Sequence, residues 1–165
     1  MSVSNTKQAE ALADLIDGIS VARLTTLTIH GFLHSRPMYT HHATANGEIW
    51  FFTDTESTKV ADIAADPRVM LTYDNHARGR YITVWGTASV LHDPDKAREL
   101  WNMHARASWP AGPDDPSLAL IRVNPESAEF WDGPSQAAYA LSLLKAVITG
   151  DAISAKSNNQ MMTLD

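Results

Sequence analysis

The spacing of apolar residues predicts one helix followed by a run of antiparallel strands. Apolar residues between positions 9 and 16 recur at helical spacing, and Gly18 ends the pattern. The chain then becomes rich in β-branched residues, and Asn46-Gly47 is a dipeptide favoured in tight turns between antiparallel strands. The strands expected in this half are residues 20–29, 32–44 and 49–53.

Helices interrupt the strands in the second half. A helix begins at Asp93-Pro94 and is expected to run to about Ala107, because Asp caps a helix and Pro suits its first position. Residues 80–91 alternate between small apolar and polar side chains, and Gly86 within this strand indicates a bend or a close backbone approach. The other elements expected are strands at 68–74, 118–123 and 127–132 and helices at 57–65 and 135–148.

This order of elements predicts a mainly β (α+β) protein with one closed antiparallel sheet of about six or seven strands. A doubly wound parallel fold requires a helix after nearly every strand, and that alternation is missing. The chain of 165 residues is expected to form a single domain over residues 1–150. Residues 151–165 are polar without a clear period, so we expect a flexible C-terminal tail there.

Composition narrows the classes of partner. The formal net charge of −6 opposes binding to a phosphate backbone, so no nucleic-acid partner is expected. The chain has no cysteine, which excludes disulfides and a thiol nucleophile. It shows neither a signal-peptide pattern nor an apolar run of the ~20 residues that span a bilayer. We therefore expect a cytoplasmic protein with no membrane partner.

Two polar segments are candidates for binding an anion, and the first contains Arg36. This residue precedes Pro37 and Met38 in an apolar strand, where a buried guanidinium needs an anionic partner and can hold a phosphate or carboxylate with two parallel bonds. Pro37 cannot donate to a strand ladder, so the strand is interrupted or lies at an edge. The alternative is an exposed Arg36 at a strand edge, and the residues alone leave both open.

The second segment is the polar turn of residues 53–59. It offers hydroxyl groups, Lys59 and the amides of a helix N-terminus, which together can cradle a phosphate. The alternative is that Ser57 or Thr55 simply caps the helix and that Lys59 is solvated. A site that combines this turn with Arg36 favours the anion-binding interpretation.

Aromatic and imidazole side chains add weaker candidates. Among five tryptophans, Trp109 and Trp131 lie beside loops or strand ends, where an indole can stack on a planar ligand; packing is the alternative for each. The seven histidines show no HxH or HExxH spacing, so no metal site is expected. The sequence also lacks the motifs of serine hydrolases, Rossmann proteins and P-loop proteins.

A resemblance to a known family rests on three segments: HSRPMYTHHATANGEIWFFTDTESTKVADIAADPRVMLTY, YITVWGTASVLHDPDKARELW and EFWD. In this order they resemble the pyridoxamine 5′-phosphate oxidase-like FMN-binding split-barrel superfamily, in particular its general stress protein branch. The likeness spans about residues 8–133. It implies a homodimer of six-stranded antiparallel split β-barrels with flanking helices, with FMN bound at the subunit interface.

The resemblance also implies which residues hold the flavin. Arg36 and Lys59 would bind the FMN phosphate with help from Ser57 and Thr58, and Trp131 would reach the flavin of the partner subunit. The residues implied along the isoalloxazine ring are Pro37, Met38, Tyr39, Phe52, Thr53 and Tyr81.

Departures from the family pattern bear on the activity. His41 stands where the oxidases have a lysine, and no Arg-x-His follows Trp131, so oxidation of pyridoxamine phosphate is not expected and no catalytic residue is assigned. The sequence favours an FMN-dependent oxidoreductase that acts with a small-molecule substrate or electron donor. The alternatives are a stress protein that holds FMN or FAD without turnover, and a split-barrel protein that binds F420 or haem. Replacing Arg36 with Ala is expected to weaken FMN binding and to leave folding nearly intact.

Overall fold

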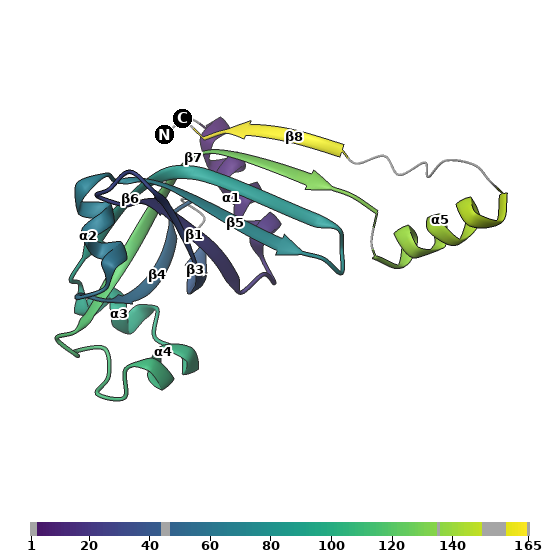
Figure 1. Ribbon diagram of the computed structural model, residues 1–165. Coiled ribbons are helices and arrows are strands. Elements are labelled where there is room, and N and C mark those ends of the chain that lie inside the picture. Colours follow the sequence, from purple (N-terminus) through teal and green to yellow (C-terminus); the bar gives the residue numbers. More distant parts are fainter. Residues whose placement is uncertain (1–2, 44–46, 135, 150–157, 165) are drawn as a thin grey trace.

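The fold is an antiparallel sheet flanked by helices, seen in a computed structural model that describes residues 3–43, 47–134, 136–149 and 158–164 (Figure 1). Its helices are α1 (Val3–Ile16), α2 (Thr58–Ala65), α3 (Pro94–Glu99), α4 (Met103–Ser108) and α5 (Gln136–Thr149). Its strands are β1 (Val21–Leu27), β2 (Leu33–Tyr39), β3 (His42–Ala43), β4 (Ile49–Asp54), β5 (Arg68–Asn75), β6 (Arg80–Leu91), β7 (Leu118–Asp132) and β8 (Asn158–Thr163).

The strands follow the order β2-β1-β5-β6-β7-β4-β3, and β8 pairs with β7 outside this path. All the ladders are antiparallel, which confirms the predicted fold class. Six of the strands, from β1 to β7 without β3, match the predicted barrel strands. Within the described residues no ladder joins β2 to β3 or β4, so the sheet is open where the barrel is split and the expectation of a closed sheet is wrong.

The split lies where the chain leaves β2. The Thr40 backbone N–H donates to the Ser20 carbonyl at 2.8 Å, next to β1, whereas the following N–H of His41 donates to the Trp50 carbonyl at 3.0 Å, on β4. Two consecutive amides therefore bond to opposite borders of the sheet. Among the described strands β2 pairs only with β1, so Pro37 lies on an edge strand, as the sequence predicts.

Two predicted strands are one continuous strand in the structure. Residues 118–123 and 127–132 both belong to β7, whose register against β6 shifts at Trp85 and Gly86. A Cβ atom on Gly86 would overlap the carbonyl of Asn124 on β7. The close backbone approach predicted at Gly86 is confirmed, and the extra residue of a β-bulge accounts for the interruption in the sequence pattern.

The helix predicted from Asp93 to about Ala107 is instead two short helices. Asp93 caps α3 as expected, because its side chain accepts from the Lys96 N–H at 2.9 Å. α3 then ends at Glu99, and Asn102 caps α4 by accepting from the Ala105 N–H. A second N-cap inside the apolar pattern thus breaks the predicted helix.

The buried side chains form two clusters. The main core packs apolar residues of β1, β4, β5, β6 and β7 against α1 and Ile63 of α2. A smaller cluster lies under α3 and α4. Its buried members are Trp50, Phe52, Ala97, Leu100, Ala105, Leu118 and Leu120, with Leu91, Trp101 and Trp109 packed against them. Trp109 therefore packs against this cluster, which is the alternative stated for it in the sequence analysis.

The C-terminal segment differs from the expectation. The predicted helix is present as α5, but residues 158–163 of the expected flexible tail form β8, which pairs with residues 127–132 of β7. A partly polar strand gives no strong period, and β7 supplies the backbone partners that order it. Residues 150–157 of the expected tail lie outside the described residues. No helix in the described parts of the chain has the length and apolar character needed to cross a bilayer.

Candidate functional site

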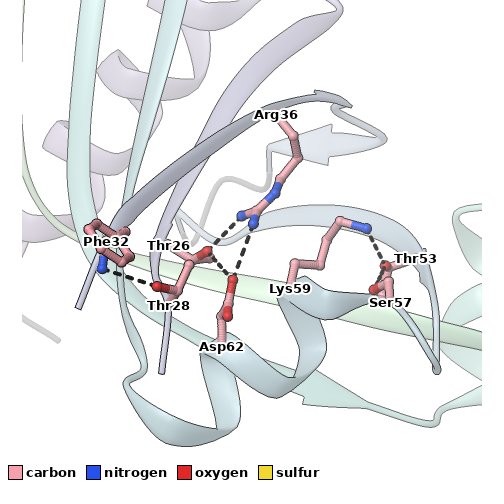
Figure 2. Close-up of polar contacts among 8 residues, drawn as sticks. All are labelled: Thr26, Thr28, Phe32, Arg36, Thr53, Ser57, Lys59 and Asp62. Atoms are coloured by element: carbon pink, nitrogen blue, oxygen red, sulfur yellow. Dashed lines mark hydrogen bonds and ion pairs between the residues drawn. The ribbon is translucent and has the colours of Figure 1, made fainter. Parts of the chain in front are cut away.

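The candidate site begins with Arg36, whose head group lies inside the protein. Arg36 pairs with Leu24 across β1 and β2, so its side chain reaches along β1 toward Thr26. One guanidinium nitrogen donates to Thr26 Oγ1 at 2.7 Å, and the other reaches Asp62 Oδ2 on α2 at 3.2 Å (Figure 2). Thr26 in turn donates to the same Asp62 oxygen at 2.7 Å. The three side chains tie α2 to the β1–β2 hairpin.

Asp62 is the partner that the sequence does not identify. The side chains of Arg36 and Asp62 are only 12% and 7% exposed, so the ion pair is buried. A buried Arg36 was one of the two open alternatives, and the exposed one is wrong. The pairing also overturns the expectation that Arg36→Ala would leave folding nearly intact, because the change would strand a buried carboxylate.

The polar turn before α2 forms the second half of the site. Lys59 Nζ donates to Thr53 Oγ1 at 3.2 Å, and the hydroxyls of Thr53 and Ser57 lie 3.0 Å apart (Figure 2). Thr53 is 2% exposed, so it fixes this cluster against the sheet. Ser57 occupies the N-cap position of α2, but its side chain makes no capping bond. The alternative in which Ser57 simply caps the helix is therefore wrong.

The two cations share one electrostatic environment. The pKa of Lys59 is lowered from its ordinary value, first by burial and then by the positive charge of Arg36, while Asp54 opposes the shift. The sequence suggested that Arg36 and Lys59 converge although they lie on different elements. The structure places them near enough for the Arg36 charge to lower the pKa of Lys59, with Arg36 bound to Thr26 and Lys59 bound to Thr53.

The other residues implied by the resemblance lie at varied depths. Pro37 is exposed on the edge strand, and Thr58 is exposed at the start of α2. Met38 is 9% exposed and belongs to the main core. Phe52 is 5% exposed beneath Trp101 and Trp109, so its ring faces the small aromatic cluster. For Met38 and Phe52, only the backbone remains for contact with a ligand.

Tyr81 and Trp131 form a separate pair at the other end of the sheet. They are opposite each other on β6 and β7, and Tyr81 also pairs with Asp74 on β5. Thr26 pairs with Val69, five residues earlier on β5, a separation of ~17 Å along the strand. One copy of the chain therefore does not bring Tyr81 and Trp131 to Arg36, and a common site would require a second copy.

A histidine cluster lies on the other side of Tyr39. The rings of Tyr39 and His104 stack with centroids 3.9 Å apart, and Asn102 Nδ2 lies 2.9 Å from His41 Nδ1. Burial, followed by repulsion from His104, lowers the pKa of His41 to about 4. His41 is therefore neutral near pH 7, with the Asn102 amide donating to Nδ1 and the ring proton on Nε2.

A cavity adjoins this cluster. It has a volume of about 510 Å³ and is lined by Tyr39, Thr40, His41 and residues 13–14 and 16–20 around the end of α1. That size suits a small organic molecule. Sequence reasoning missed Asp62, Asn102 and His104, because nothing in the local pattern shows which acid, amide or imidazole becomes buried.

An open antiparallel barrel with a buried Arg–Asp pair and a lysine–hydroxyl cluster at a helix N-terminus defines a split-barrel protein with a candidate site for an anion. Residues 7–154 match the family model described as "Pyridoxamine 5'-phosphate oxidase like". The chain belongs to this family, which confirms the family resemblance stated from the sequence.

Individual relatives agree with this assignment. General stress protein 26 of Bacillus subtilis is 27% identical over 137 residues, which are 81% of this chain and 95% of that protein. Protein bli-3 of Neurospora crassa is 32% identical over 109 residues, 61% of this chain, so the match spans about half (52%) of that protein. The crystal structure of a general stress FMN/FAD binding protein from Xanthomonas citri is 25% identical, with a TM-score of 0.66 over 76% of this chain and 89% of that chain.

Proposed function

We propose that this protein is a cytoplasmic, homodimeric, stress-related flavoprotein that binds FMN and acts as an oxidoreductase on a small organic molecule. FAD is the alternative flavin, since the Xanthomonas citri relative is described as FMN/FAD binding. The observation that carries the proposal is the convergence of Arg36 and Lys59, two cations on different elements, on one hydroxyl-lined corner.

The donor set suits a phosphate ester. A guanidinium has five N–H donors, and the contacts of Arg36 with Thr26 and Asp62 use only two of its nitrogens. Lys59 adds a point charge, and Ser57 adds a hydroxyl at the start of a helix whose amides favour anions. Asp62 pairs with Arg36, and the Asp54 charge acts on Lys59, so the phosphate would be held by directed N–H and O–H donors and not by an excess of positive charge.

Each side chain then has a distinct task. Asp62 is a positioning residue that holds the Arg36 guanidinium in place through its ion pair. The exposed edge of β2 beside Pro37 and Tyr39 offers backbone and ring surface for a flat ligand. A bound flavin would supply hydride exchange at its N5 atom. The cavity beside His41 is the proposed place of the substrate, where a neutral imidazole can donate one hydrogen bond.

The proposal is tested by FMN titration followed by a turnover assay. We expect saturable binding of FMN with a red-shifted or resolved flavin absorbance band, and reduction of the bound flavin by NADH, NADPH or another small donor. Matched variants are Lys59→Met, which should weaken binding, and Lys7→Met on α1, which should not, because Lys7 is exposed on a helix outside the site. Unchanged affinity in Lys59→Met would reject the proposed site.

A flavin-binding protein without turnover is the second candidate. It is favoured by the lowered pKa of His41, because the neutral imidazole beside the cavity can donate a hydrogen bond but cannot act as a general acid near pH 7. Tight FMN binding with no reduction by any donor tested would select this candidate. Repeated reduction of the bound flavin by a donor, followed by its reoxidation by an organic acceptor, would select the oxidoreductase.

A further inference from the structure

The C-terminal helix α5 presents large apolar side chains to solvent over about half of its circumference. Six of them are between 40% and 81% exposed: Tyr139, Leu141, Leu143, Leu144, Val147 and Ile148. The hydroxyls of Ser142 and Thr149 turn inward and donate to helix carbonyls at 2.9 and 3.0 Å. Lys145 is the one charged residue in the helix sequence. In Figure 1, α5 lies beyond the end of the sheet, away from the other elements.

Such a helix needs a partner. An isolated helix of 14 residues is marginal in water, because its stability normally comes from packing an apolar face. Its exposed side chains offer several hundred Å² of apolar surface, on the order of the ~800 Å² that each partner buries in a standard interface. A membrane-surface helix normally has a basic polar face as well, and α5 has none. The composition therefore favours a protein partner.

The base of α5 is held at one end of the sheet, and the helix lies away from the strands of its own chain (Figure 1). The Arg80 and Asp132 side chains form an ion pair at 2.7 Å, and the Gly133 N–H donates to the Gly79 carbonyl at 2.9 Å. On the return side, Asn158 pairs with Asp132 at the start of β8. The helix spans only ~21 Å from this anchored end of the sheet.

A complementary apolar surface lies at the opposite end of the sheet. It is the tip of the β1–β2 hairpin, where Ile29, Phe32 and Leu33 are 70%, 71% and 78% exposed. Phe32 is tied by its backbone N–H to Thr28 Oγ1, two residues from Thr26 in the Arg36 cluster (Figure 2). The hairpin tip is therefore next to the candidate phosphate site.

We propose that α5 of each copy packs on the β1–β2 hairpin tip of a second copy, beside the Arg36–Lys59 site. In a two-fold dimer, α5 of the first copy can cover the hairpin tip of the second copy while α5 of the second copy covers the hairpin tip of the first. Both apolar patches of each chain are then buried. The same exchange brings Trp131, at the base of α5, toward the partner's site. This inference rests on the proposed homodimer and specifies the contact that builds it.

The absence of cysteine from the sequence permits a clean crosslinking test. The double variant Phe32→Cys/Leu144→Cys should form a disulfide-linked dimer under mild oxidation, whereas each single variant should not. Dimers from Leu144→Cys alone would mean that two α5 helices pack on each other, and would overturn the proposal. The absence of any linked dimer from the double variant in a sample that circular dichroism shows to be folded would overturn it too.

Charge substitutions provide a second readout by analytical ultracentrifugation. Leu144→Asp should raise the dimer dissociation constant at least tenfold, and Met103→Asp, on an 83% exposed residue of α4, should change it less than twofold. Equal effects of the two substitutions would overturn the proposal. It would also be overturned if Leu144→Asp abolished cosedimentation with phosphatidylglycerol vesicles and left the dimer dissociation constant unchanged. FMN titration of the same samples separates the two proposals, since flavin binding with a failed crosslink rejects only the α5 contact.

Discussion

Replacing Asp62 with Asn tests the buried pair at the centre of the site. The substitution keeps the shape of the side chain and an acceptor for Thr26, but it removes the negative charge that Arg36 contacts at 3.2 Å. Removing one partner of a buried ion pair typically costs ~3–5 kcal/mol. Because the side chains are 12% and 7% exposed and Asn retains part of the hydrogen bonding, we expect about 2–3 kcal/mol.

The loss should be visible in the flavin-free protein by thermal and chemical unfolding. For a chain of this length, 1 kcal/mol corresponds to roughly 2–4 °C in melting temperature, so the midpoint should fall by about 4–12 °C. FMN should then stabilise Asp62→Asn less than it stabilises the wild type, because Arg36 is no longer held in place for the phosphate.

A double-mutant cycle separates the pair from its surroundings. Arg36→Met alone should also destabilise the protein, while Arg36→Met combined with Asp62→Asn should lose clearly less than the sum of the two single variants. Additive losses, or an Asp62→Asn protein as stable as the wild type, would refute the reasoning that Asp62 holds Arg36.

Three further predictions concern pH and packing. The pKa of Lys59 is lowered in the folded protein, so the free energy of unfolding should rise as pH increases through that pKa. A bound phosphate favours the charged amine, so FMN affinity should fall over the same pH range. The Lys59→Met substitution should abolish both trends. The pKa of His41 is about 4 in the folded protein against 6.5 ordinarily, so the free energy of unfolding should fall by ~1–2 kcal/mol between pH 6.5 and pH 4, after allowance for the partial exposure of the ring. The His41→Gln substitution should flatten this dependence on pH. The control His30→Gln, at an exposed position, should leave it unchanged. Gly86→Ala should cost ~1–3 kcal/mol or more in denaturant unfolding, because the new Cβ meets the β7 backbone, and a stability equal to the wild type would show that the bulge adapts freely.

Most of the fold could be predicted because its signals are local. Strand β6 alternates cleanly, Asp93 precedes Pro94 at a helix start, and Gly86 interrupts a strand, so each feature carries its own physical cause. The errors arose where a partner decides the outcome. β8 is ordered by pairing with β7, and Asn102 ends the predicted helix by capping α4.

The candidate site divides in the same way. Arg36 and Lys59 stand out in the sequence because each charge lies beside an apolar strand. Asp62 could not be recognised, because the pattern of α2 does not show that its single acid turns inward toward Thr26. Tyr81 and Trp131 lie far from Arg36 in the same chain and can approach an Arg36–Lys59 site only in a second copy. Their role at the flavin therefore stays a prediction.

In the proposed site a phosphate group anchors the ligand, and riboflavin is the matched control because it is FMN without the phosphate. Two charge-assisted contacts at ~1.5–3 kcal/mol each predict that FMN binds at least ~100-fold more tightly than riboflavin in isothermal titration. In Lys59→Met this ratio should shrink by at least tenfold while riboflavin affinity stays the same. Equal affinities for FMN and riboflavin in the wild-type protein would contradict the account.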